Sequence, residues 1–287
     1  MLAYLCPDYY RKLIKYLQNA SLKLPETKTR PMATHPKHNH IVIDTTGSLG
    51  KADLQIFTDG SKTDHHVGAG MVVMKNYKEI HSEIRRLGLD CSVFQAELID
   101  INLAVDWLSH QRYGNSSYAI DSESKAALLA IANKRTNHPL AVDARNKLIN
   151  LKSSTLINLH WVKDHAGLQG NERADHHAKT DASHITTIDY KGIPLIRCKQ
   201  LLTNHYRRIW NSTYINSEQG LHTKTFIPNI PHRLSLSLGP SYITTQFLTN
   251  HGHFRSYLYK MNKCPSPLCN CPEKPPQTAL HLIMECS

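Results

Sequence analysis

Residues 54–61 read Leu-Gln-Ile-Phe-Thr-Asp-Gly-Ser, and this stretch decides the fold. Its apolar and β-branched residues up to Thr58 predict a buried strand, and Asp59-Gly60-Ser61 predicts the turn that ends it. Two further strands are predicted at 68–75 and 80–87, near enough along the chain to pair as antiparallel neighbours. The sequence therefore predicts three antiparallel strands, with an acidic residue at the end of the first.

Helical signals follow these strands. Ser92-Val93-Phe94-Gln95 is a capping box in the Ser-x-x-Gln form, and apolar residues then recur on one helical face. Glu97 therefore lies in the first turns of an amphipathic helix. Residues 118–120 predict a buried strand that ends at Asp121, where another helix begins.

One more helix, strand and helix complete the predicted sheet. A helix at 140–151 leads to a strand at 155–162, and after a loop comes a helix that Asn171 can cap. Asp175 falls in the first turn of this last helix. The order of the elements predicts an α/β fold, a mixed five-stranded sheet with flanking helices.

Four acidic side chains stand at the ends of these elements: Asp59, Glu97, Asp121 and Asp175. Any one alone is explained as a turn residue or as a favourable charge in the first turn of a helix. Together they are better explained by convergence, because the first and fourth strands of such a sheet can be neighbours. Carboxylates suit Mg²⁺, and two such ions about 4 Å apart assist phosphodiester hydrolysis. The four acids therefore predict a metal-dependent nuclease centre.

The same positions carry a family resemblance. The segments that carry it are 58–61, 68–70, 95–98, 121–124 and 165–175. In their residues and order, they resemble type I ribonuclease H, over residues 51 to about 185. The resemblance implies a ribonuclease H-like fold and an endonuclease that hydrolyses the RNA strand of RNA/DNA hybrids, leaving 3′-hydroxyl and 5′-phosphate ends.

The resemblance also implies which residues hold the metal. Asp59 would bridge two Mg²⁺ or Mn²⁺ ions, and Glu97, Asp121 and Asp175 would complete their coordination. His165 stands in a glycine-bounded loop, where it would assist proton transfer or product departure. Without the resemblance, His165 would be read as a surface residue of that loop.

Substrate contacts are expected from residues next to these acids, namely Gly60, Ser61, Ser122 and Glu123. Contacts to 2′-hydroxyl groups would select RNA over DNA. Glu123 departs from the family pattern, which often has Gln at this position. A carboxylate donates no hydrogen bond and repels phosphate, so this departure predicts weaker nucleic-acid binding.

The net charge of +11 is unevenly distributed along the 287 residues. Residues 1–50 carry seven basic and three acidic side chains, residues 51–185 carry sixteen of each, and residues 186–287 carry eleven and four. A basic excess suits a polyanion, because each Lys or Arg placed on a phosphate releases counterions. A solvated, solubilising surface is the alternative.

One stripe in the basic C-terminal region mixes aromatic and basic side chains: Tyr206, Arg207, Arg208 and Trp210. Such a stripe can bind single-stranded RNA or DNA by stacking on the bases. The same pattern is also typical of one face of a packed helix, so both interpretations stay open.

Four of the seven cysteines lie in the last 24 residues. An odd number so spaced predicts metal binding in a reducing compartment, not a disulfide framework. Residues 248–258 and the cysteines after them resemble the zinc-knuckle-like end of polyproteins from non-LTR retrotransposons. On that resemblance the expected Zn²⁺ ligands are Cys269, Cys271, His281 and Cys286. Cys264 is an alternative ligand, because its distance from Cys269 fits the common spacing, and a metal-free, disordered basic end is also open.

Four parts are therefore expected: a leader helix and linker (1–50), a ribonuclease H domain (51–185), a basic helical connector (186–247) and a zinc-binding tail (248–287). Together they predict the terminal portion of a retrotransposon polyprotein. No Tyr or Phe followed by x-Asp-Asp occurs, so the polymerase domain of that polyprotein is expected elsewhere and is an expected partner.

No membrane partner is expected. The chain has no apolar run of about 18 residues and no signal-peptide core, which predicts an intracellular protein, in the nucleus or the cytoplasm. Two alternatives to the polyprotein nuclease remain: a catalytically inactive nucleic-acid-binding module and a cellular ribonuclease H.

Overall fold

The computed structural model describes residues 15, 41–47, 52–111, 117–151, 157–163, 167–239 and 241–287. The chain forms two compact units, Met1–Lys199 and Gln200–Ser287, each packed within itself. Apart from residue 15, the predicted leader before residue 41 lies outside the described part of the chain.

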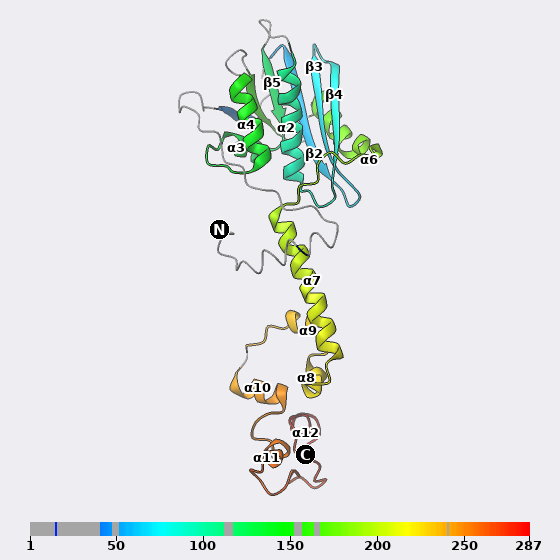
Figure 1. Ribbon diagram of the computed structural model, residues 1–287, viewed down its shortest axis with the longest axis vertical. Coiled ribbons are helices and arrows are strands. Elements are labelled where there is room, and N and C mark those ends of the chain that lie inside the picture. The colour runs from blue at the N-terminus through cyan, green and yellow to red at the C-terminus, as the bar shows by residue number, and fades with distance from the viewer. Residues whose placement is uncertain are drawn as a thin grey trace. The chain divides into compact units, whose positions relative to one another are not determined.

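The first unit is built on a six-stranded mixed sheet (Figure 1) with the strand order β1-β6-β5-β2-β3-β4. Its strands are β1 (Ile43–Gly47), β2 (Leu54–Lys62), β3 (Val67–Lys75), β4 (Lys78–Leu87), β5 (Tyr118–Ser122) and β6 (Ile157–Val162). Strands β2, β3 and β4 pair antiparallel, whereas β5, β6 and β1 continue the sheet in parallel on the other side of β2. The predicted α/β class and mixed sheet are confirmed.

The sheet has six strands and not the predicted five, and the additional strand is β1. It lies in the segment that was expected to be a linker, and it pairs parallel with β6, with Ile43 opposite Leu159. The signal was weak because an edge strand has one neighbour and because Val42, the apolar residue before it, is 65% exposed. Strands β2 and β5 also run past their predicted ends, so Asp59 and Asp121 lie inside strands.

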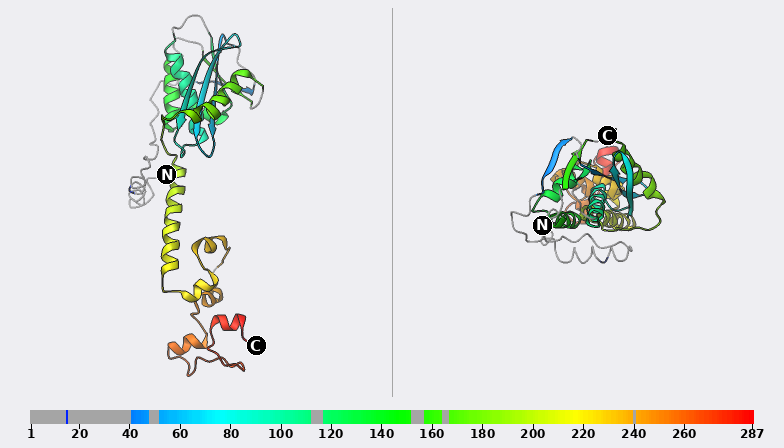
Figure 2. Two further views of the ribbon diagram at one scale, coloured as in Figure 1. Left: turned by 90° about the vertical axis from the view of Figure 1, so that its right-hand side faces the viewer. Right: turned by 90° about the horizontal axis from the view of Figure 1, so that it is seen from above.

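Helices cover both faces of this sheet (Figure 2). One face carries α2 (Val93–Ser109), α3 (Lys125–Ala132) and α4 (Pro139–Leu151), and the other carries α5 (Gln169–His176), the π-helical turn η3 (His177–Asp181) and α6 (Ala182–His184). Side chains alternate along a strand, so Ile56 faces the large core under α2 while Phe57 packs with Ala174 of α5.

The predicted capping box starts α2. The backbone N–H of Ser92 donates to Oε1 of Gln95 at 2.9 Å, and the backbone N–H of Gln95 donates to Oγ of Ser92 at 3.2 Å. Both bonds satisfy amide groups that have no partner within the helix. The start of α2 is therefore fixed, and with it the position of Glu97 in the second turn.

Two glycines let helices lie directly against the strand backbones. A Cβ atom at Gly60 would stand 2.5 Å from the backbone nitrogen of Glu97, and one at Gly70 would stand 2.8 Å from the carbonyl oxygen of Ala174. Real Cβ atoms do not come so close to backbone, so only glycine fits at either position. This close packing brings Glu97 of α2 and Asp175 of α5 to the same part of β2.

The second unit is mostly helical, as predicted. Helix α7 (Leu195–Asn216) leads into it, and α8 (Leu221–Phe226), α9 (Ile230–Ser235), α10 (Tyr242–Thr249), α11 (Arg255–Lys260) and α12 (Ala279–Met284) follow. Asn250 ends α10 in the left-handed conformation, and its Oδ1 accepts a hydrogen bond of 2.8 Å from the N–H of Ala279 at the start of α12. Within the described residues, no helix has the length and apolarity needed to cross a bilayer.

Candidate functional site

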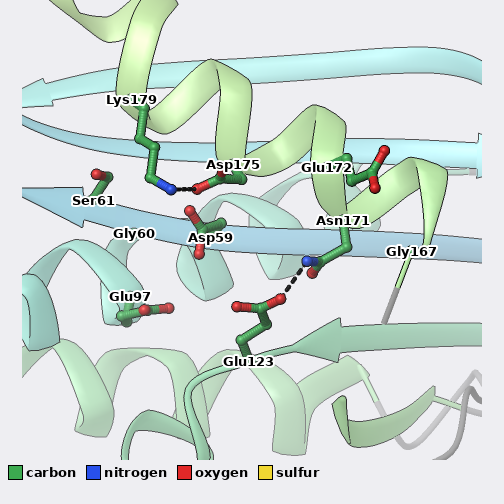
Figure 3. Close-up of a pocket in the computed structure, with 10 residues that line it drawn as sticks. All are labelled: Asp59, Gly60, Ser61, Glu97, Glu123, Gly167, Asn171, Glu172, Asp175 and Lys179. Atoms are coloured by element: carbon green, nitrogen blue, oxygen red, sulfur yellow. Dashed lines mark hydrogen bonds and ion pairs between the residues drawn. The ribbon is translucent and has the colours of Figure 1, made fainter. Parts of the chain in front are cut away.

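A pocket rich in carboxylates lies where β2, α2 and α5 meet (Figure 3). It is lined by Asp59, Gly60, Ser61, Glu97, Glu123, Gly167, Asn171, Glu172, Asp175 and Lys179. The structure thus brings together three of the four predicted metal ligands, from three separate elements: Asp59 from β2, Glu97 from α2 and Asp175 from α5. Asp59 and Glu97 are buried, whereas Asp175 is about one-third exposed.

The fourth predicted ligand, Asp121, lies on β5 and is fully buried. It stands opposite Phe57, and the next register pair is Thr58 with Ser122. The residue that comes level with Asp59 is therefore Glu123, just beyond the end of β5. Accordingly, Glu123 lines the pocket and Asp121 does not.

Glu123 is held by two neighbours. The side-chain amide of Asn171 donates to Oε1 of Glu123 (Figure 3), and the indole N–H of Trp161 donates to its carbonyl oxygen at 2.9 Å. Asn171 was expected to cap its helix, but α5 begins at Gln169 and the amide turns to Glu123 instead. The earlier start also puts Asp175 in the second turn of α5, not in the first.

Some of the other predicted site residues line the pocket and others do not. Gly60 and Ser61 line the pocket, whereas Ser122 is fully buried and its hydroxyl accepts the N–H of Ser124 at 3.2 Å. His165, the predicted auxiliary residue, lies outside the residues that the structure describes. Gly167, from the same loop, lines the pocket.

Burial and mutual repulsion raise the pKa values of the acids in this pocket. Burial, followed by the charge of Asp175, raises the pKa of Asp59 to about 7. Burial, followed by the charge of Asp59, raises the pKa of Glu97 to about 9. Asp100, one helical turn after Glu97, is completely buried, and burial raises its pKa well above the usual range. Carboxyl groups in this condition favour a nearby cation.

Among the described residues, Lys179 on η3 is the one basic side chain that lines the pocket. Its Nζ lies 2.7 Å from Oδ1 of Asp175, and its charge opposes the rise in the pKa of Asp59. Lys179, Asp100 and Glu172 were not predicted as site residues from the sequence. The i, i+4 spacing from Asp175 could have indicated Lys179, whereas the burial of Asp100 depends on how α2 packs.

The donor set of the pocket fits a hard divalent cation. Asp59, Glu97 and Asp175 supply carboxylate oxygens from three elements, and such oxygens are the ligands that Mg²⁺ and Mn²⁺ prefer. Burial and the charges of neighbouring acids raise the pKa values of Asp59 and Glu97, so a bound cation would favour their ionised forms. Lys179 opposes only part of the rise in the pKa of Asp59.

A second cluster of ligand atoms lies in the tail. Those of Cys269, Cys271, His281 and Cys286 all lie within 4.8 Å of one another. Sγ of Cys269 is 3.8 Å from Sγ of Cys286, and Sγ of Cys271 is 3.5 Å from Nε2 of His281. Cys264 is not in the cluster, because its thiol donates to the carbonyl oxygen of Ser266 at 3.2 Å.

The thiols of this cluster differ in acidity. The backbone N–H of Cys271 is the main cause that lowers the pKa of Cys269 to about 6. The neighbouring sulfur of Cys269 raises the pKa of Cys286 to about 11. Three sulfurs and one imidazole nitrogen form the donor set of a tetrahedral structural zinc site.

Comparisons with known proteins bear on the first unit. Residues 51–183 match the family model of RNase H. The chain is 28% identical over 104 residues to the retrovirus-related Pol polyprotein from type-1 retrotransposable element R1 4 of Nasonia vitripennis, which covers 33% of this chain and 26% of that polyprotein. It is also 28% identical over 111 residues to the retrovirus-related Pol polyprotein from type-1 retrotransposable element R1 of Bradysia coprophila. This match covers 37% of this chain and 11% of that polyprotein. The chain thus spans only a small part of these relatives.

The raised pKa values predict how the metal-free stability depends on pH. A carboxyl group whose pKa is higher in the folded state stabilises the protein below its unfolded pKa of about 4, and this contribution is lost as pH rises through the folded value. For Asp59 this stabilising contribution is lost as pH rises to about 7, and for Glu97 it is lost as pH rises to about 9. The melting temperature in Mg²⁺-free buffer should therefore fall between pH 5 and 9, and added Mg²⁺ should restore it most at high pH. The melting temperature of the Asp59→Asn variant should fall less over this pH range. A wild-type melting temperature that does not change with pH would contradict the raised pKa values of the two acids.

The ion pair of Lys179 predicts an effect on metal affinity. Lys179→Met should raise the affinity for Mg²⁺ or Mn²⁺ by roughly two- to five-fold in titration calorimetry, because a half-exposed ion pair of modest strength no longer competes for Asp175. Lys147→Met is the matched control, since Lys147 pairs with Asp143 at the same i, i+4 spacing and at 2.8 Å, outside the pocket. Weaker metal binding by Lys179→Met would show that Lys179 does not compete with the cation.

Proposed function

We propose that the segment 51–183, which matches the family model of RNase H, hydrolyses the RNA strand of RNA/DNA hybrids in a metal-dependent reaction. The observation that carries this proposal is the convergence of Asp59, Glu97 and Asp175 in one pocket where burial and neighbouring acids raise the pKa values of Asp59 and Glu97. Bound there, two Mg²⁺ ions would activate the attacking water and stabilise the leaving oxygen.

The side chains contribute position and charge. Asp59, on the strand between the other two acids, would hold the cations together with Glu97 and Asp175. Asp121 is the fourth carboxylate of the proposal, since its strand runs parallel to β2 and its side chain faces the same side of the sheet as that of Asp59. His165, in the sequence segment just before Gly167, is the proposed proton carrier.

Glu123 is proposed to contact the substrate together with Gly60 and Ser61. It adds a negative charge beside Asp59 and Glu97, and it raises the pKa values of both. Phosphate therefore meets more repulsion here than it would meet at a Gln. This charge supports a division of labour in which the basic C-terminal region supplies affinity for the nucleic acid.

We propose that this reaction serves reverse transcription within a longer polyprotein. The two R1 Pol polyproteins support this context over a cellular ribonuclease H. A second candidate function, a nucleic-acid-binding module without catalysis, is favoured by one observation: the full burial of Asp121, away from the pocket lining.

We further propose that Cys269, Cys271, His281 and Cys286 bind one Zn²⁺ that holds the tail together. The segment from Arg255 to Ser287 has only two short helices, so it has little core of its own, and metal binding would supply folding free energy. Gln277 supports the site, since its side-chain amide donates to Sγ of Cys269 at 3.7 Å.

Asp59→Asn tests the nuclease proposal. Cleavage of a labelled RNA/DNA hybrid in Mg²⁺ should fall by several orders of magnitude, because the bridging ligand is neutralised, whereas hybrid binding should stay within a few-fold. Asp143→Asn, which removes an exposed acid outside the pocket, should cleave like the wild type. Assays with RNA/RNA and DNA/DNA duplexes define the substrate. Binding without cleavage by the wild-type protein, with no Mg²⁺ bound, would favour the binding module.

Single Cys→Ser variants of the full chain test the zinc site. The wild type should contain about one zinc per chain by mass spectrometry. Cys269→Ser and Cys271→Ser should lose most of it, because each removes a ligand. Cys264→Ser should keep it, since that thiol donates to a carbonyl group outside the cluster. Zinc loss in Cys264→Ser alone would overturn the ligand set.

A further inference from the structure

Helix α7 has an unusual composition for a surface helix. Its 22 residues include no Asp or Glu, but they include Arg197, Lys199, Arg207 and Arg208. The wider unit, residues 200–287, carries eight Lys and Arg against three Asp and Glu. A polyanion is therefore the partner whose charge complements this helix.

Two large aromatic rings lie exposed on the same helix. Tyr206 is 42% exposed and Trp210 is 51% exposed, and a spacing of four residues puts both on one side of α7. Arg207, also exposed, is three residues before Trp210 and borders the same side. Tyr206, Arg207 and Trp210 are called the ring face here.

The ring face adjoins the residues by which α7 packs within its unit, since Tyr214 is four residues after Trp210 and Asn211 is four residues after Arg207. Packing uses Asn211, whose Oδ1 accepts the N–H of Ile230 at 2.9 Å, and Tyr214, whose hydroxyl donates to the carbonyl oxygen of Ile227 at 2.7 Å. These contacts satisfy polar groups on the α8 and α9 side. Tyr206 and Trp210 nevertheless stay 42% and 51% exposed while the helix is packed.

We infer that the ring face of α7 binds single-stranded RNA or DNA, with bases stacked on Tyr206 and Trp210 and a phosphate on Arg207. Unpaired bases expose both faces, and aromatic side chains stack on any base. A guanidinium beside the rings fits the phosphate of the same strand. This site is separate from the carboxylate pocket and needs no cleavage, so it survives if the nuclease proposal fails.

The test uses the full-length Asp59→Asn protein, so that cleavage does not interfere, and a fluorescent twelve-residue oligo(U) or oligo(dT) as the probe. Tyr206→Ala and Trp210→Ala should each weaken binding by roughly five-fold to more than a hundred-fold, from about 1–3 kcal/mol per stacked base. Trp210→Phe should restore most of the affinity. Ile215→Ala is the matched control, because Ile215 is 50% exposed and lies about 140° around the helix from Trp210.

The two adjacent arginines, Arg207 and Arg208, allow a second test, based on salt dependence. Arg207→Gln should make the dependence of log affinity on log salt shallower by about 0.7, the value for one phosphate on a single strand, and Arg208→Gln should change it less. Equal binding by Trp210→Ala and wild type would overturn the inference, as would equal losses in Trp210→Ala and Ile215→Ala. A third outcome would also overturn it: Trp210→Ala abolishes self-association in sedimentation experiments but leaves oligonucleotide binding unchanged. The ring face would then be a protein interface.

Discussion

The structure of the first unit depends on one constraint, which is that several carboxylates of like charge are held in one buried place. Two unit charges about 4 Å apart repel by about 4 kcal/mol at an effective dielectric constant of 20. The rise in the pKa of Glu97 to about 9 shows the repulsion and burial that this side chain meets. Such an arrangement persists only if the scaffold is stable without it. The apolar residues of β2, β3 and α2, most of them buried, provide that scaffold.

The scaffold also explains why the acids cannot move apart. At Gly60 the start of α2 lies against the backbone of β2, and at Gly70 the end of α5 lies against β3. Side chains that begin on such closely packed backbones have short reach and few alternative rotamers. In the free protein, relief comes instead from protonation of the carboxyl groups whose pKa is raised and from the positive charge of Lys179. A pocket arranged in this way is preorganised for cations, since the carboxyl groups are already gathered before the cation binds.

Much of this arrangement was predictable from sequence, and the failures have physical reasons. The strand around Asp59 and the capping box before Glu97 rest on local patterns, which the structure keeps. The four cysteine and histidine residues that the resemblance singled out lie together in the tail. Strand β1 was missed because an edge strand pairs with a distant partner. The side chain of Asn171 was predicted as a cap, but it donates to Glu123, 48 residues away. Register decides that Glu123 comes level with Asp59, and register is not a local property.

In the proposed function, the carboxylate pocket and the basic C-terminal region divide the electrostatic task of binding a nucleic acid. Residues 51–185 have equal numbers of acidic and basic side chains, and five of the acids gather in the pocket, so phosphate near the pocket meets repulsion. Cations bound there can cancel this repulsion locally, but they add little attraction at a distance because salt screens it beyond about 10 Å. Affinity for a long polyanion must therefore come from basic groups outside the pocket. The excess of Lys and Arg after residue 185 meets that requirement. Within this region, α7 has basic side chains and no acidic ones, so no carboxylate of the helix itself offsets its positive charge.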